Sequence, residues 1–115
     1  MGGCKKLTMK EYILCAANFY NDGERHTHSP LNIMNGFVIC GRRHHNCIDI
    51  FAMMVGFPYD EKGHKLHQTE VQGFLTNENR FVSRKEALKI ATEAKQLIHA
   101  VKLDSNIGLT SEDVW

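Results

Sequence analysis

The sequence predicts a single α+β domain, in which a small antiparallel sheet packs against one long helix and one shorter helix. The first observation behind this prediction is the length of 115 residues with 43% hydrophobic and 23% charged residues, the content of one domain with one core. The second is a series of short β-rich runs separated by turn residues. The third is an apolar stripe at helical spacing after residue 84.

The composition and the charge of the chain indicate the cell compartment and the partners that it is expected to have. Residues 1–10 are polar without a periodic apolar signal and are expected to form a loose lead-in. No apolar run approaches the ~20 residues of a spanning helix, and no signal-peptide core follows the N-terminus, so a cytoplasmic protein is predicted. A net charge of +1 gives little long-range attraction to nucleic acid polymers or membranes. The four irregularly spaced cysteines indicate reduced thiols.

The first half of the chain contains two predicted strands. Residues 12–20 combine aromatic and β-branched side chains and precede a turn at 21–23, which predicts a strand. Asn35-Gly36 marks a second turn, and residues 37–40 form the next predicted strand. The apolar spacing that follows predicts a helix from about 45 to 55.

The second half begins with residues 57–68, which are polar without a period and are interpreted as a surface loop. Residues 71–76 predict a third strand. Ser83 and Glu86 have the spacing of a capping box, and the apolar stripe behind them predicts a helix from about 84 to 101. Residues 104–115 form a polar tail whose Trp115 is either bound in a groove or exposed.

Basic and polar residues gather where two predicted strands end. Arg42, Arg43, His44, His45 and Asn46 follow the strand at 37–40 and precede a helix, a geometry that favours anions because helix N-termini present free amide donors. A second corner has the same order of strand, polar turn and helix start, with Asn79, Arg80 and Arg84. Two such corners facing each other would form a pocket. Nearby, Phe74 and Phe81 either offer ring faces to a base or belong to the core.

Zinc ligand types also occur at the first corner, where Cys40 and Cys47 flank two histidines. The spacing lacks a Cys-x2-Cys pair, and both cysteines are predicted to be small buried residues, Cys40 in its strand and Cys47 on the apolar stripe of the following helix. We therefore predict no metal ligands and no cofactor. No motif for a nucleophile, a phosphate loop or a carboxylate pair is present, so no catalytic residue is predicted. A His/Cys metal-dependent enzyme acting on phosphate esters remains an alternative.

Several motifs between residues 12 and 115 carry a family resemblance: Cys15-Ala16-Ala17, Gly36-x-Val38-x-Cys40-Gly41-Arg42-Arg43-His44-His45-Asn46-Cys47, Gln72-Gly73-Phe74-Leu75-Thr76 and the closing Thr110-Ser111-Glu112-Asp113-Val114-Trp115. Together they resemble a group of small bacteriophage proteins that includes the anti-Thoeris sponges, which sequester cyclic ADP-ribose signals made by bacterial TIR-domain immune proteins.

The resemblance implies a non-enzymatic subunit that forms a homo-oligomer, either a dimer or a larger assembly such as a hexamer, in the infected bacterial cell. It also implies a cyclic nucleotide ligand, cyclic ADP-ribose or a cyclic oligonucleotide, held between subunits and not cleaved. In that role arginines would neutralise phosphates, histidines and asparagines would hydrogen-bond, and a phenylalanine would stack on the base. The candidate residues are Arg25, His28, Arg42, Arg43, His44, His45, Asn46, Phe74, Asn79, Arg80, Phe81 and Arg84. A phage structural or interaction protein is the remaining alternative.

Overall fold

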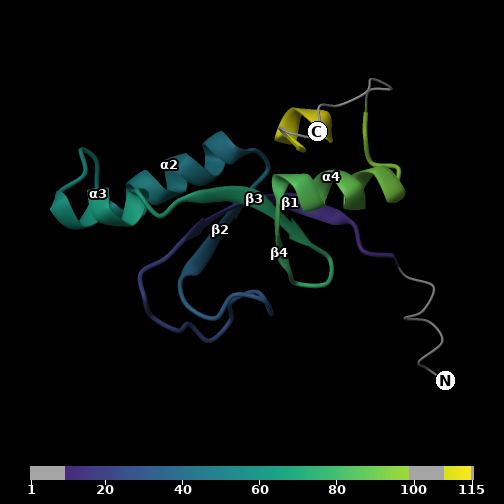
Figure 1. Ribbon diagram of the computed structural model, residues 1–115. Coiled ribbons are helices and arrows are strands. Elements are labelled where there is room, and N and C mark those ends of the chain that lie inside the picture. The colour runs from purple at the N-terminus through teal and green to yellow at the C-terminus, as the bar shows by residue number, and fades with distance from the viewer. Residues whose placement is uncertain (1–9, 99–107, 115) are drawn as a thin grey trace.

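The computed structural model describes residues 10–98 and 108–114. Its centre is a four-stranded antiparallel sheet with the strand order β2-β1-β3-β4, formed by β1 (Ile13–Tyr20), β2 (Phe37–Gly41), β3 (Val71–Thr76) and β4 (Phe81–Ser83). Helices lie on one side of this sheet (Figure 1), namely α2 (His44–Val55), α3 (Glu61–His67), α4 (Arg84–Glu93) and the 3-10 helix η1 (Ser111–Asp113). The α+β prediction is confirmed.

The strands at 12–20, 37–40 and 71–76 and the helix at 45–55 are confirmed almost to the residue. β1 takes a central place because both its edges are paired, with Ala17 opposite Cys40 of β2 and Gly73 of β3. Side chains alternate between the two faces of a strand, so each strand contributes one row to the helix-covered face and one to the opposite face, called here the open face.

The core fills the space between the sheet and the helices. Tyr20 of β1 and Phe51 of α2 are fully buried, and their rings stack with centroids 4.1 Å apart and planes inclined by 10°. Phe74 of β3, also fully buried, extends this layer toward α4, where Ala87 and Ala91 face the sheet. Small alanines on α4 allow the helix to approach closely, so aromatic rings on one side meet small residues on the other.

The prediction of a loop over residues 57–68 is wrong, because α3 occupies most of this segment. The Asp60 carboxylate accepts a hydrogen bond from the Gly63 N–H at 2.7 Å and caps the helix. Glu61 in the first turn and the basic residues of the last turn complement the helix dipole. These capping signals were present in the sequence. The helix is short, however, and makes its apolar contact through Leu66, so its sequence shows no periodic apolar stripe.

The helix predicted over residues 84–101 ends early, at Glu93. Lys95 adopts a left-handed φ of 58°, which ends the helix. Beyond it, the Gln96 side chain accepts from the Ile13 N–H and donates to the Ile13 carbonyl, both at 2.8 Å. This pairing with β1 replaces further helical turns between residues 94 and 98. Residues 99–101 lie outside the described part of the chain.

The strand β4 was not predicted, since a three-residue strand carries little sequence signal. The Ser83 hydroxyl accepts from the Glu86 N–H at 3.1 Å, as expected for the cap of α4, although the Glu86 carboxylate contacts Arg80.

Within the predicted polar tail, Leu109 and Val114 are buried in the core. The lead-in through residue 9 and Trp115 lie outside the described residues. No described helix is long and apolar enough to cross a membrane.

The segment from residue 21 to residue 36, called here the β1–β2 loop, lies on the open face below the sheet (Figure 1). The Asn32 side chain accepts from the Phe81 N–H at 2.9 Å and donates to the Phe81 carbonyl at 2.6 Å. Leu31 adds a backbone bond to the Asn79 carbonyl at 2.8 Å. The loop thereby covers the outer edge of β4, which would otherwise expose unpaired backbone groups.

Candidate functional site

Internal hydrogen bonds give the β1–β2 loop a defined shape. The Gly36 N–H donates to the Glu24 carbonyl at 2.8 Å, and the Glu24 N–H donates to the Asp22 carboxylate at 3.0 Å. Gly36 needs its φ of 99°, and no side chain fits there because a Cβ would lie 2.7 Å from a ring carbon of Phe19. The chain therefore closes into a ring whose interior is available to a ligand.

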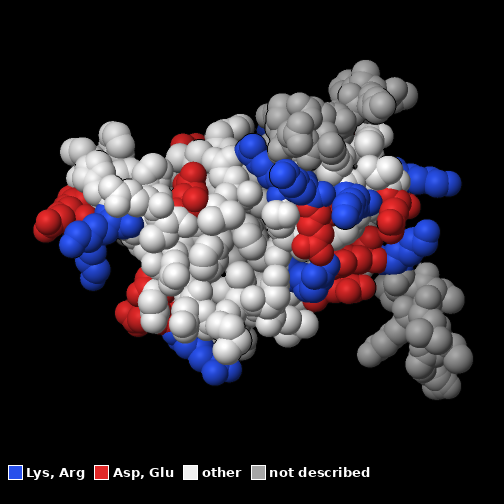
Figure 2. Space-filling view, in the orientation of Figure 1, with Lys and Arg blue, Asp and Glu red and all other residues white. Residues whose placement is uncertain are grey.

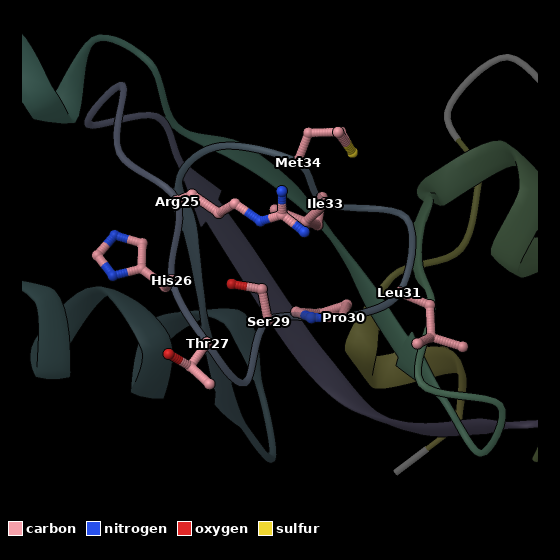
Figure 3. Close-up of a pocket in the computed structure, with 8 residues that line it drawn as sticks. All are labelled: Arg25, His26, Thr27, Ser29, Pro30, Leu31, Ile33 and Met34. Atoms are coloured by element: carbon pink, nitrogen blue, oxygen red, sulfur yellow. The ribbon is translucent and has the colours of Figure 1, made fainter.

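A cavity of about 510 Å3, open to solvent, lies within this ring. Figure 3 shows the guanidinium of Arg25 extending across the ring toward Ile33 and Met34. Hydroxyl groups and apolar side chains complete the wall, so the cavity offers a cation, neutral hydrogen-bonding groups and apolar surface together. Its lining residues are Arg25, His26, Thr27, Ser29, Pro30, Leu31, Ile33 and Met34. The predicted ligand residue His28 is exposed on the same loop but does not line the cavity.

A histidine–carboxylate pair lies at the edge of this cavity. His26 Nε2 is 2.8 Å from the Asp22 carboxylate, and the His26 ring meets Phe37 edge-on at 6.0 Å between centroids. The backbone N–H of Glu24, assisted by His26, holds the pKa of the Asp22 carboxyl below its ordinary value. Asp22 therefore stays ionised near neutral pH and orients His26, while Arg25 brings a permanent positive charge to the cavity.

The first predicted corner is partly buried. His44 Nε2 lies 2.8 Å from the Gly73 carbonyl oxygen, and its ring meets Phe74 edge-on at 5.0 Å. Phe74 has no exposed surface, so the core alternative for this residue holds and its ring is closed to a stacking base in this conformation. His44 connects the start of α2 to β3 across the central strand.

The other residues of that corner lie nearer the surface. The Asn46 side chain accepts from the Arg43 N–H at 3.0 Å and so caps the first turn of α2. Arg42 and His45 are exposed. Cys47 is fully buried, as its place on the helix stripe predicts. The prediction that Cys40 is also buried is wrong, because strand alternation places its side chain on the open face, where it is exposed.

The second corner meets the first on β3. Arg84, at the start of α4, donates from Nη2 to the side-chain oxygen of Gln72, the neighbour of the Gly73 that His44 contacts. Figure 1 shows α2 and α4 running outward from this middle region of the sheet. Among the described residues, Arg84 Nε and Asn18 Oδ1 are buried without a hydrogen-bond partner. His44 and Arg84 thus contact neighbouring residues of β3 inside the fold.

The sequence over residues 12–115 matches the family model of the phage T4 y16D protein. The chain belongs to this family. No curated protein and no solved structure matches the chain. The family match covers the same stretch as the phage resemblance in the sequence, so the grouping with small phage proteins is confirmed at that level.

In this y16D-family chain, the predicted ligand residue Arg80 is already paired. Its Nε and Nη2 donate to the Glu11 carboxylate at 2.8 Å each, and Nη2 also lies 3.0 Å from the Glu86 carboxylate. Figure 2 shows acidic and basic side chains intermixed at the end of the molecule that carries α4. Phe81 packs against Phe19 at 6.0 Å, and Asn79 shapes the turn with a φ of 60°. This corner is a structural clamp between the N-terminal segment and α4.

Stability of the clamp should depend on pH. The Arg80 hydrogen bond holds the pKa of Glu11 below its ordinary value, so the ionised carboxylate stabilises the fold at neutral pH and this contribution is lost as the pH falls below about 4.5. We expect the free energy of unfolding of the wild type to drop by about 1 kcal/mol more than that of Glu11→Gln between about pH 6 and about pH 3, since the pair is partly exposed. Urea unfolding at both pH values measures this, and equal drops would contradict the clamp.

Within residues 10–98 and 108–114, no three His, Cys, Asp or Glu side chains gather as a metal site would require. Cys40 and Cys47, which flank the histidines in sequence, lie on opposite faces of the sheet. Cys47 donates through Sγ to the Ala16 carbonyl at 3.7 Å under α2, while Cys40 faces solvent on the other side. These two thiols do not converge on one ion in this fold.

Most of the cavity wall was missed in the sequence. Of the predicted residues, Arg25 alone lines the cavity, and the wall residues Thr27, Ser29, Leu31 and Met34 carry no motif. One signal was available, because the segment between the strands at 12–20 and 37–40 is far longer than the usual ~2–5 residues of a hairpin loop, and long ordered loops are often functional.

Proposed function

We propose that this phage protein sequesters a cyclic nucleotide signal of the cyclic ADP-ribose class in the cavity of the β1–β2 loop, in the cytoplasm of the infected cell, and so blocks TIR-based immunity. The observation that carries the proposal is Arg25 in a cavity of about 510 Å3 that also has hydroxyls and apolar walls. Small-molecule sites usually measure roughly 300–1,000 Å3 and combine apolar walls with a few polar groups.

Each part of such a ligand has a matching part of the wall. The Arg25 guanidinium fits phosphate oxygens, because its planar donors form paired charge-assisted hydrogen bonds. The hydroxyls of Thr27 and Ser29 suit ribose or phosphate oxygens. Leu31 and Met34 offer apolar contact for a base. We expect these residues to hold the nucleotide tightly and to release it unchanged.

Assembly of subunits would complete this site. Leu31 is 77% exposed and Met34 is 70% exposed, although both line the cavity. Apolar side chains at the rim of a polar cavity are expected to gain stability when a second subunit covers them. The homo-oligomer is therefore part of the proposal, with the ligand held under the adjoining subunit.

The binding test replaces Arg25 with alanine. Calorimetric titration with a cyclic ADP-ribose isomer and a cyclic dinucleotide should show tight binding by the wild type and about a 30-fold weaker affinity for Arg25→Ala, the value of one charge-assisted contact of ~2 kcal/mol. Lys89→Ala, which removes an exposed cation from α4, should bind as the wild type does.

The variant Arg42→Ala distinguishes binding of the phosphate in the β1–β2 loop from binding at the start of α2. Loss of affinity in Arg42→Ala with none in Arg25→Ala would move the site to the start of α2 and overturn the loop assignment. Chromatography of the ligand released by heating distinguishes sequestration from catalysis. A cleaved product would favour an enzyme acting on phosphate esters, for which the oriented His26 beside Asp22 is the supporting observation.

A further inference from the structure

We propose that Cys15 and Cys40 form an oxidation site on the open face of the sheet, where a peroxide converts the two thiols into one reversible disulfide. The proposal does not depend on the ligand of the β1–β2 loop. It rests on the strand register, which makes the two cysteines diagonal neighbours on one face of the sheet, and on the exposure of Cys40.

The register places both thiols on one face of adjacent strands. Cys40 of β2 lies opposite Ala17 of β1, and Cys15 is two residues before Ala17, so the side chains of Cys15 and Cys40 project on the same side. They are diagonal neighbours, a relation in which side chains of adjacent strands can still touch. Each thiol also shifts the pKa of the other, as neighbouring groups do.

Access and reactivity favour Cys40 as the attacking group. Cys40 is exposed and Cys15 is half-buried, while Cys47 is buried on the opposite face. The hydrogen bond from Cys15 lowers the pKa of Cys40 to about 7, against the opposing effect of burial. A large fraction of Cys40 is therefore thiolate near neutral pH, the form that reacts with peroxides, whereas the pKa of Cys15 is raised by the same contact and by burial.

The reaction needs one peroxide molecule for each disulfide. The Cys40 thiolate attacks one oxygen of hydrogen peroxide, the O–O bond breaks, and the released hydroxide takes up a proton to give water and a sulfenic acid. The Cys15 sulfur then attacks the sulfenic sulfur and forms the S–S bond, while the S–O bond breaks and the leaving hydroxide takes up the proton of the Cys15 thiol to give the second water. Two thiols lose two electrons and two protons, and the peroxide is reduced to two waters.

The consequence is a covalent link around the cavity loop. A bond between Cys15 and Cys40 would join β1 to β2 and close the chain from residue 15 to residue 40, which includes the whole β1–β2 loop. Cross-links that close a segment of this length restrict the unfolded chain, so the oxidised protein should melt roughly 10 °C higher than the reduced protein.

The test uses the full chain with Cys4→Ser, which removes the one cysteine outside the described residues. Stoichiometric hydrogen peroxide should lower the intact mass by about 2 Da, abolish two of the three reactive thiols in the unfolded protein, and yield a single linked peptide pair containing Cys15 and Cys40. Dithiothreitol should reverse all three changes. Before oxidation, iodoacetamide should label Cys40 at least about ten times faster than Cys15.

Matched variants decide between a pair and independent cysteines. In Cys15→Ser, Cys40 has no partner in its own chain and should be oxidised to sulfinic acid or form a disulfide between two chains. Cys40→Ser should abolish the intramolecular disulfide. Cys47→Ser should behave as the parent does. The proposal is overturned if the parent forms only sulfinic acid or only linked dimers, or if Cys47 appears in the linked peptide. Thermal melting of the parent before and after oxidation provides the second readout.

Discussion

Phe51→Ala should cost about 3–5 kcal/mol of unfolding free energy, the usual penalty for removing a buried aromatic ring. Phe51 is fully buried, stacks on Tyr20 at 4.1 Å and meets Tyr59 edge-on at 5.5 Å. Its loss would leave a cavity between β1 and α2 and remove the contact that connects α2 to the Tyr59 segment. Urea unfolding followed by circular dichroism measures the effect.

The matched control for this change is on the same helix. Met53 is 83% exposed, and Met53→Ala should change the unfolding free energy by less than about 0.5 kcal/mol. Because both variants remove a large apolar side chain from α2, the comparison isolates burial from helix propensity. Similar small losses in both variants would show that the stacked rings are not the centre of the core.

A methyl group at Gly73 should be nearly as costly. A Cβ at this position would lie 2.8 Å from the ring of Phe81 and closer still to the Val82 carbonyl oxygen of the neighbouring strand. A backbone oxygen cannot move aside as a flexible side chain can, so β3 and β4 would have to separate. We expect Gly73→Ala to lose about 3 kcal/mol of stability.

Gly63 provides the comparison, since it is also buried but lies in α3. Its Cβ would meet Asp60 Oδ1 and Tyr59 Cβ at 3.3 Å each, which is tight but short of a clash. Alanine also favours a helix over glycine by about 1 kcal/mol, so Gly63→Ala should change stability by less than about 1 kcal/mol in either direction. If Gly73→Ala is as mild as Gly63→Ala, the close approach of β3 and β4 is not a constraint in solution.

Local patterns in the sequence determined most of the secondary structure. The β-rich runs bounded by turn residues placed three strands, because alternating side chains and turn chemistry act within a few residues. The stripe through Cys47 and Phe51 placed α2 for the same reason. Where the signal was short, as in β4, or depended on a cap, as with Asp60 before α3, the pattern was too weak to detect.

The end of α4 shows how tertiary contacts override a local pattern. The apolar stripe continues through Leu97 and Ile98 and favours more helix, yet Gln96 pairs with the backbone of Ile13 instead. That partner is distant in sequence, so no property of residues 94–98 indicates it. A bidentate bond to a strand backbone outweighs the small propensity of one further helical turn.

The difference between local patterns and tertiary contacts also decides which features of the candidate site could be predicted. By itself, the sequence determined the fold class, the basic corners and the family resemblance, because these depend on residue types in local order. Only the tertiary structure decided that Arg80 is held by Glu11 and Glu86, that Arg25 faces a cavity, and that Cys15 and Cys40 lie on one face of adjacent strands. Each of these depends on strand register and loop closure, which bring together groups that no spacing in the chain connects.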